Sequence, residues 1–153
     1  MSVLRTFKFI DKSSLEIVSG QYDLWLPSES ALNRGTAFLF PTDNTTITIP
    51  ATSSRVISVG AYDALTFAYA DFSGRGSMEV SGQKPDLVAP GVNVTTVASG
   101  GGYASFSGTS FATPFVTGSA ALLMEWGIVK GNDPYLYGEK VKAYLRRGAK
   151  PLP

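Results

Sequence analysis

The first third of the chain alternates short apolar runs with turn residues. Val3, Phe7 and Phe9 alternate with other residues, and four further runs rich in β-branched or aromatic residues occupy positions 15–18, 22–26, 37–40 and 46–49. Ser19-Gly20, Pro27-Ser28 and similar pairs separate these runs. Such spacing is typical of short strands joined by turns, so the pattern predicts a β-rich segment without a helix.

The pattern changes after Arg55. Residues 56–61 form a compact apolar run that suits a buried strand of an α/β sheet, with Gly60 as its end. Residues 72–82 are rich in glycine and serine and predict a loop. Residues 84–94 predict a short strand bounded by prolines, and three glycines at 100–102 predict a flexible connection.

Two helices are predicted near the C-terminal end. The stronger signal starts after Ser110 and continues to about Trp126, where Gly127 can end it. This segment is apolar nearly all round, which predicts a helix in the interior of a domain. The second helix is predicted at 138–147, with Val141, Tyr144 and Leu145 facing inward and Gly148 as its stop.

Composition narrows the classes of partner. Only 16% of the 153 residues are charged and 44% are hydrophobic, so much of the chain should be buried in one domain or part of one. The 13 basic and 12 acidic residues are dispersed, which predicts neither a nucleic-acid nor an anionic-membrane partner. No apolar stretch approaches the ~20 residues of a membrane span, and no leader is predicted. The compartment stays open.

The absence of two residue types limits the chemistry. The chain has no cysteine, which excludes disulfides and thiolate metal sites, and it has no histidine. Histidine is the commonest general base, so a serine, histidine and aspartate triad cannot be completed within these residues. We predict no cofactor.

Four segments resemble the subtilases, the subtilisin-like serine peptidases of family S8. Residues 106–122, which include Gly108, Thr109 and Ser110 followed by Phe-Ala-Thr-Pro, resemble the nucleophile segment. Three segments precede it in the order typical of the family: 55–61 (Arg-Val-Ile-Ser-Val-Gly-Ala), 72–76 (Phe-Ser-Gly-Arg-Gly) and 86–91 (Asp-Leu-Val-Ala-Pro-Gly). Together they are far more specific than Gly-Thr-Ser alone.

The resemblance makes Ser110 the expected nucleophile. At the start of a helix, free backbone N–H groups and the positive end of the helix dipole favour a developing negative charge, so the Ser110 N–H is the expected oxyanion donor. Gly108 permits a tight turn and leaves room for an acyl group, while Thr109 positions that turn. Pro114 is expected in the first turn, where its missing N–H breaks no helical bond.

What the family implies goes beyond these residues. In subtilisin-type enzymes the triad aspartate and histidine precede the serine, so this chain is expected to be the C-terminal part of the catalytic domain. The complete domain would be an endopeptidase that cleaves proteins or peptides through an acyl-enzyme. The isolated chain should be inactive, because it needs the upstream portion of the domain as its partner.

Some positions depart from the family pattern. Phe115 stands where the family usually has a histidine, which affects packing rather than mechanism. Asn44 lies outside the family's Ala-Gly-Asn context, so we interpret it as a loop residue and expect the oxyanion asparagine upstream. Asp86 is expected to be a structural carboxylate. Lys84 supplies a positive charge near a segment where some subtilases bind a cation, so no metal is predicted.

Residues 20–27, 45–52 and 124–134 are similar to a clostridial branch of subtilases that includes spore-germination proteases. That branch carries an inserted jelly-roll-like β segment. The resemblance implies that residues 1–50 are the end of this insert and that residues 51–153 are the C-terminal portion of the catalytic domain.

The expected fold class is therefore α/β: a partial three-layer subtilase fold with a mainly parallel sheet and flanking helices, preceded by an antiparallel β segment. Three other interpretations remain. Ser110 alone would fit a helix N-cap; the whole would fit a pseudoprotease or regulatory binding protein; and residues 1–50 would fit a carbohydrate-binding module. A partial core predicts an aggregation-prone isolated chain.

Overall fold

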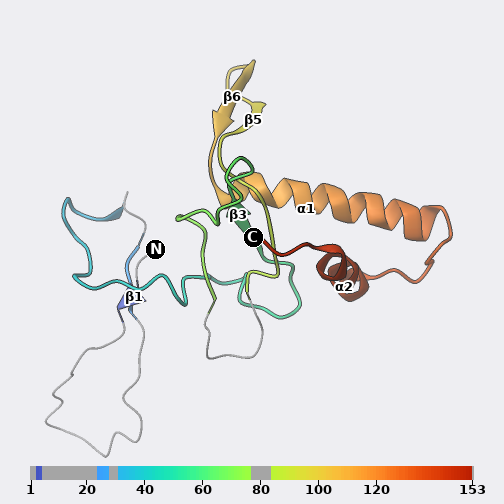
Figure 1. Cartoon of the computed structure of the whole chain (residues 1–153), viewed down its shortest axis with the longest axis horizontal. Coiled ribbons are helices and arrows are strands. Elements are labelled where there is room, and N and C mark those ends of the chain that lie inside the picture. Colours follow the sequence, from blue (N-terminus) through green and yellow to red (C-terminus); the bar gives the residue numbers. More distant parts are fainter. Residues whose placement is uncertain (1–2, 5–23, 28–30, 77–83, 153) are drawn as a thin grey trace, which may run out of the picture.

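The computed structural model describes residues 3–4, 24–27, 31–76 and 84–152. Within these residues, three pairs of strands are followed along the chain by three helical elements (Figure 1). The strands are β1 (Val3–Leu4), β2 (Leu24–Trp25), β3 (Val59–Tyr62), β4 (Leu87–Pro90), β5 (Val94–Val97) and β6 (Tyr103–Phe106). The helices are α1 (Thr109–Met124), which runs directly into the π-helix η2 (Glu125–Val129), and α2 (Gly138–Gly148).

The core lies where α1 crosses the parallel pair β3 and β4. These strands are in register from Val59 opposite Leu87 to Tyr62 opposite Pro90. Small side chains let the helix approach the strands closely, and four alanines form the buried cluster, namely Ala61, Ala70, Ala89 and Ala112. The parallel pair and its helix are the α/β arrangement that the sequence predicts.

A serine turn completes the outer edge of β3. Ser73, only 4% exposed, accepts a hydrogen bond from the Ala61 N–H at 2.9 Å. Its hydroxyl donates to the Tyr69 hydroxyl at 2.9 Å, which donates in turn to the Gly74 carbonyl at 2.7 Å. The Ala61 N–H therefore finds its hydrogen-bond acceptor in a side chain rather than in a neighbouring strand.

Along the chain, a hairpin separates β4 from α1. β5 and β6 pair antiparallel, with Val94 opposite Phe106 and Val97 opposite Tyr103. Gly100, Gly101 and Gly102 all have positive φ, a conformation that glycine adopts without strain. The predicted flexible connection is thus a hairpin turn, and Figure 1 shows the hairpin projecting beside the N-terminal end of α1.

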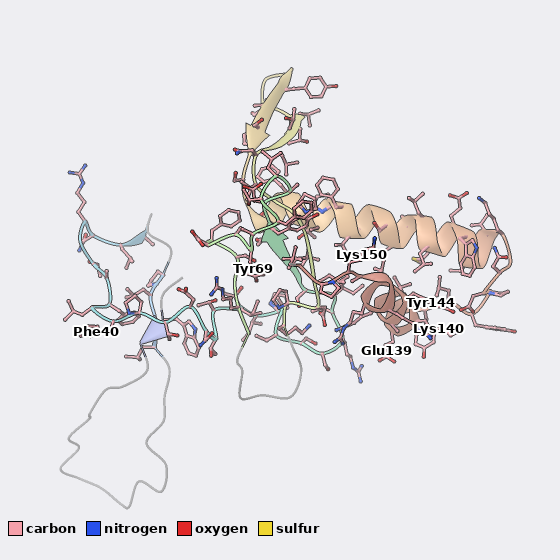
Figure 2. All side chains as sticks on the ribbon, viewed as in Figure 1. Phe40, Tyr69, Glu139, Lys140, Tyr144 and Lys150 are labelled. Atoms are coloured by element: carbon pink, nitrogen blue, oxygen red, sulfur yellow. The ribbon has the colours of Figure 1, made fainter. Side chains whose placement is uncertain are left out.

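The predicted strands at 37–40 and 46–49 are wrong. Both segments are irregular, and Leu39, Phe40 and Ile49 are 90%, 83% and 87% exposed. They lack a neighbouring strand among the described residues, and Figure 2 shows Phe40 far from both helices. β1 and β2 do pair antiparallel, whereas the predicted run at 15–18 lies outside the described residues.

Helix α1 differs from its prediction in three ways. Most of it is exposed, because its 16 residues span about 24 Å at 1.5 Å per residue and extend beyond four-residue strands of about 13 Å. Gly127 does not end it, since this glycine is buried inside η2. Pro114 lies in the second turn, so its missing N–H deprives the Ser110 carbonyl of its helical donor.

Three hydroxyls on α1 bond to its own backbone. Thr113, Thr117 and Ser119 each donate to the carbonyl four residues earlier, at 2.9, 3.1 and 2.8 Å. The Thr109 carbonyl, which accepts the bond from Thr113, directly precedes the Ser110 carbonyl that lacks a helical donor because of Pro114. These local bonds satisfy side chains that would otherwise need water.

Residues Thr109–Val129 form one helical stretch of 21 residues that is long and apolar enough to cross a membrane by length and composition alone. This corrects the expectation that no stretch approaches membrane-spanning length. Core helices of soluble proteins satisfy the same two criteria, so the observation is weak evidence for a membrane.

Candidate active site

Ser110 is the second residue of α1 and is exposed to solvent. Gly108 precedes the helix with φ 155° and ψ 157°, and no acidic residue occupies the first turn. The positive end of the helix dipole is therefore not neutralised by a carboxylate of that turn. The Ser110 hydroxyl has no hydrogen-bond partner within the part of the chain that the structure describes.

The turn before Ser110 is held against the end of β4. The Gly108 N–H donates to the Gly91 carbonyl at 2.8 Å, and the Gly91 N–H donates to the Tyr62 carbonyl at 3.0 Å. A Cβ on Gly91 would lie 2.6 Å from the Ala61 Cβ and 3.0 Å from the Gly108 oxygen. Only glycine permits this close approach. The sequence placed Gly91 in a family motif but did not indicate what this glycine does.

Two more contacts join the hairpin to this turn. The Asn93 N–H donates to the Ser107 hydroxyl oxygen at 2.9 Å. The rings of Phe106 and Phe111 are stacked, with centroids 5.2 Å apart and planes 9° from parallel. Phe106, which precedes Ser107, is thus in contact with Phe111, which follows Ser110. Neither contact could be identified from the sequence.

A cavity of about 250 Å³ opens beside Thr109. Its wall mixes apolar side chains with two carboxylates, those of Asp43 and Asp71, and with hydroxyls that include Ser73. Asp43 lies 3.7 Å from the Arg75 guanidinium, a solvent-exposed pair that contributes little energy. The cavity is the hollow that adjoins the predicted nucleophile turn.

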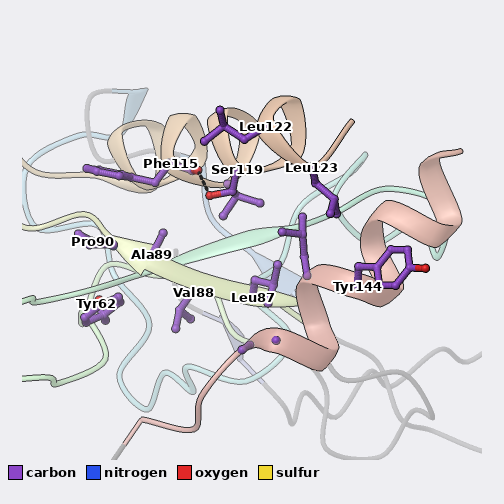
Figure 3. A pocket seen from close by; sticks show the side chains of 14 residues that line it. Tyr62, Leu87, Val88, Ala89, Pro90, Phe115, Ser119, Leu122, Leu123 and Tyr144 are labelled. Atoms are coloured by element: carbon purple, nitrogen blue, oxygen red, sulfur yellow. Dashed lines mark hydrogen bonds between the residues drawn. The ribbon is translucent and has the colours of Figure 1, made fainter. Parts of the chain in front are cut away.

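A larger hollow lies elsewhere. A groove of about 670 Å³ runs between β4, α1 and α2, and Figure 3 shows Leu87, Phe115 and Leu123 along it. Its lining is mostly apolar and includes neither Gly108 nor Ser110. The groove therefore does not adjoin the predicted nucleophile.

Asp86 lies at the other end of β4 from the Gly108 turn. Its carboxylate, 2% exposed, is 2.7 Å from the Lys84 ammonium and 2.8 Å from that of Lys142. It also accepts bonds from the N–H and hydroxyl of Ser58, at 2.8 and 2.9 Å. Lys142 belongs to α2 and donates further to the carbonyls of Ser54 and Val56. The cluster ties α2 to the parallel pair.

The charge state of Asp86 follows from these contacts. Burial alone would raise its pKa, but hydrogen bonds from Lys142, Lys84 and Ser58 outweigh burial and lower the pKa to about 2. A carboxylate that is ionised at neutral pH and held by two lysines suits the structural role expected from the sequence.

The remaining predicted residues are also placed. Asn44 lies in a turn, where its N–H donates to the Thr42 hydroxyl at 3.3 Å, and Phe115 is half-exposed on α1. Across residues 31–76 and 84–152, no three acidic side chains come together in an arrangement that could hold a metal ion.

The chain matches known proteins over most of its length. The family model of the subtilase family, Peptidase_S8, matches residues 27–152. Serine protease AprX of Bacillus subtilis (strain 168) is 36% identical over 126 residues, covering 69% of this chain and 27% of that protein. Subtilisin Savinase of Lederbergia lenta is 35% identical, covering 80% of this chain and 42% of that protein.

A solved structure is also similar. The CspB protease of Clostridium perfringens is 49% identical with a TM-score of 0.77, covering 86% of this chain and 28% of that one. The similarity to CspB confirms the predicted α/β fold class and the predicted resemblance to subtilases. The chain spans less than half the length of each of these three proteins.

Proposed function

Because this chain belongs to the subtilase family of serine peptidases, we propose that it is the nucleophile-bearing part of a serine endopeptidase, with Ser110 as the nucleophile. The observation that carries the proposal is the position of Ser110. It is exposed in the first turn of α1, directly after a glycine turn that is bonded to Gly91.

This position suits attack on a carbonyl carbon. The Ser110 oxygen would form a bond to the scissile carbon of a protein or peptide substrate while a base removes the hydroxyl proton. The resulting oxyanion would accept a hydrogen bond from the Ser110 N–H, at the positive end of the α1 dipole. Collapse would release the amine, which takes up the proton, and water would then hydrolyse the acyl-enzyme.

In the proposed enzyme, the base and its orienting acid would come from outside these residues. The chain contains no histidine, so the proton acceptor of the triad is not among its 153 residues. We assign the histidine, the aspartate and the oxyanion asparagine to the upstream portion of the same domain. The isolated chain would then be inactive, since loss of triad members costs roughly 10⁴ to 10⁶ in rate.

A fluorophosphonate probe tests the proposal, because it labels only a serine that a base activates. The probe is applied to the longest native polypeptide that contains this chain, called the parent polypeptide below, and the adduct is mapped by peptide mass. We expect labelling at Ser110, no labelling in Ser110→Ala, and unchanged labelling in Ser119→Ala, whose hydroxyl lies on the same helix. A folded but unlabelled parent polypeptide would favour a pseudoprotease instead.

A further inference from the structure

The stacked pair of Phe106 and Phe111 closes the loop that carries Ser110. Phe106 is the last residue of β6, and Phe111 directly follows Ser110 in α1. Their rings are 5.2 Å apart between centroids and nearly parallel, at 9°. Both residues are only partly exposed.

The enclosed loop needs such a restraint. Gly108 has no side chain, and its backbone, at φ 155°, belongs to a range that glycine reaches with little resistance. The Phe111 ring lies over this glycine, since a Cβ built on Gly108 would be 3.5 Å from the ring. Because Phe106 stacks on the same ring, the ring pair limits how the glycine turn can move.

The other restraints act on different atoms. The bond from the Gly108 N–H to the Gly91 carbonyl holds one peptide, and the Ser107 hydroxyl holds the hairpin strand through Asn93. Neither contact touches the residues after Ser110. The Phe111 N–H donates to the Gly108 carbonyl at 3.0 Å, which joins the two ends of the serine turn, and the ring pair extends this link to Phe106 at the end of β6.

We propose that Phe106 is a positioning residue for Ser110, acting through its ring contact with Phe111. This inference rests on the proposed function of Ser110. Aromatic pairs contribute to stability beyond their buried area, and a misplacement of about 1 Å near a reacting group can cost roughly 100-fold in rate. Phe106 itself need not touch substrate.

The test compares three variants of the parent polypeptide. Phe106→Ala removes the ring, Phe106→Tyr keeps it, and Tyr103→Ala removes an exposed ring from the same hairpin. We expect Phe106→Ala to lower kcat and the fluorophosphonate labelling rate by roughly 10- to 100-fold, with KM changed much less. Phe106→Tyr and Tyr103→Ala should keep both rates within about twofold of the unmodified protein.

A second measurement separates positioning from folding and from the proposed function. Hydrogen exchange of the peptide covering residues 107–111 should accelerate in Phe106→Ala, while exchange in α2 stays unchanged. If exchange accelerates but the unmodified protein is never labelled, the proposed function fails and the restraint stands. Unchanged exchange at 107–111, or an unchanged labelling rate in Phe106→Ala, would overturn the inference.

Discussion

Replacing Gly91 by alanine tests whether the close approach of β4 to α1 holds Ser110 in place. The new Cβ would lie 2.6 Å from the Ala61 Cβ and 3.3 Å from the Ala112 Cβ. Carbon atoms pack at about 3.5 to 4.0 Å, so residue 91 must move by about 1 Å from Ala61 in β3 and by a few tenths of an ångström from Ala112 in α1. None of these neighbours is the end of a flexible side chain.

The displacement has two measurable costs. Overpacking of this kind destabilises a core by about 1–3 kcal/mol. The same shift moves the Gly108 turn, because the Gly91 carbonyl accepts its N–H at 2.8 Å. A shift of about 1 Å at the serine is expected to slow fluorophosphonate labelling of Ser110 by roughly 100-fold.

The assay uses the parent polypeptide, with urea unfolding followed by tryptophan fluorescence and labelling followed by mass. Gly118→Ala is the matched control, because this glycine lies in α1 and a Cβ there meets nothing within 4 Å. That control should be as stable as the unmodified protein or up to about 1 kcal/mol more stable. If Gly91→Ala unfolds at the same urea concentration and is labelled at the same rate, the close-approach argument is wrong.

Three further predictions concern Asp86 and the isolated chain. The folded-state pKa of Asp86 is lowered from 3.8 to about 2, so the stability that this carboxylate contributes is complete above about pH 4 and is lost as the pH falls toward 2. The substitution Asp86→Asn should therefore lower the free energy of unfolding by about 2 kcal/mol at pH 7 and by less at pH 2, measured by urea unfolding at both pH values. The isolated 153 residues should show no Ser110-dependent peptide hydrolysis, and measurable hydrolysis that Ser110→Ala abolishes would contradict this. In sedimentation they should self-associate, since Leu122, Trp126 and other large apolar residues are exposed, whereas a monodisperse monomer that unfolds cooperatively would refute the idea.

The elements with clear boundaries could be predicted from the sequence. β3 and β4 were expected as short apolar runs near glycine or proline, but both are shorter than predicted, and Gly60, the predicted end of the first, lies inside β3. Helix α2 was expected because Val141 and Leu145 recur at helical spacing. The first of these, Val141, is buried as predicted. Ser110 was expected at the start of a helix, and the helix begins one residue before it.

Other features depend on distances that a sequence does not contain. The role of Gly91 follows from what surrounds its Cα, and the pairing of Phe106 with Phe111 follows from where the hairpin folds back. The apolar run after Ser110 indicates a helix whose side chains favour burial, but it does not indicate which part of a protein would cover that helix. That is why α1 was predicted in an interior and is largely exposed in this chain.

The hydroxyls of α1 change what it would cost to cover this helix. Burying a hydroxyl without a partner costs about 1–3 kcal/mol by protein mutational data. Thr113, Thr117 and Ser119 already donate to carbonyls of their own helix, so none of the three would lose its donor bond when water is stripped away. The exposed face of α1 can therefore pass from water into a dry contact while losing little beyond its hydration.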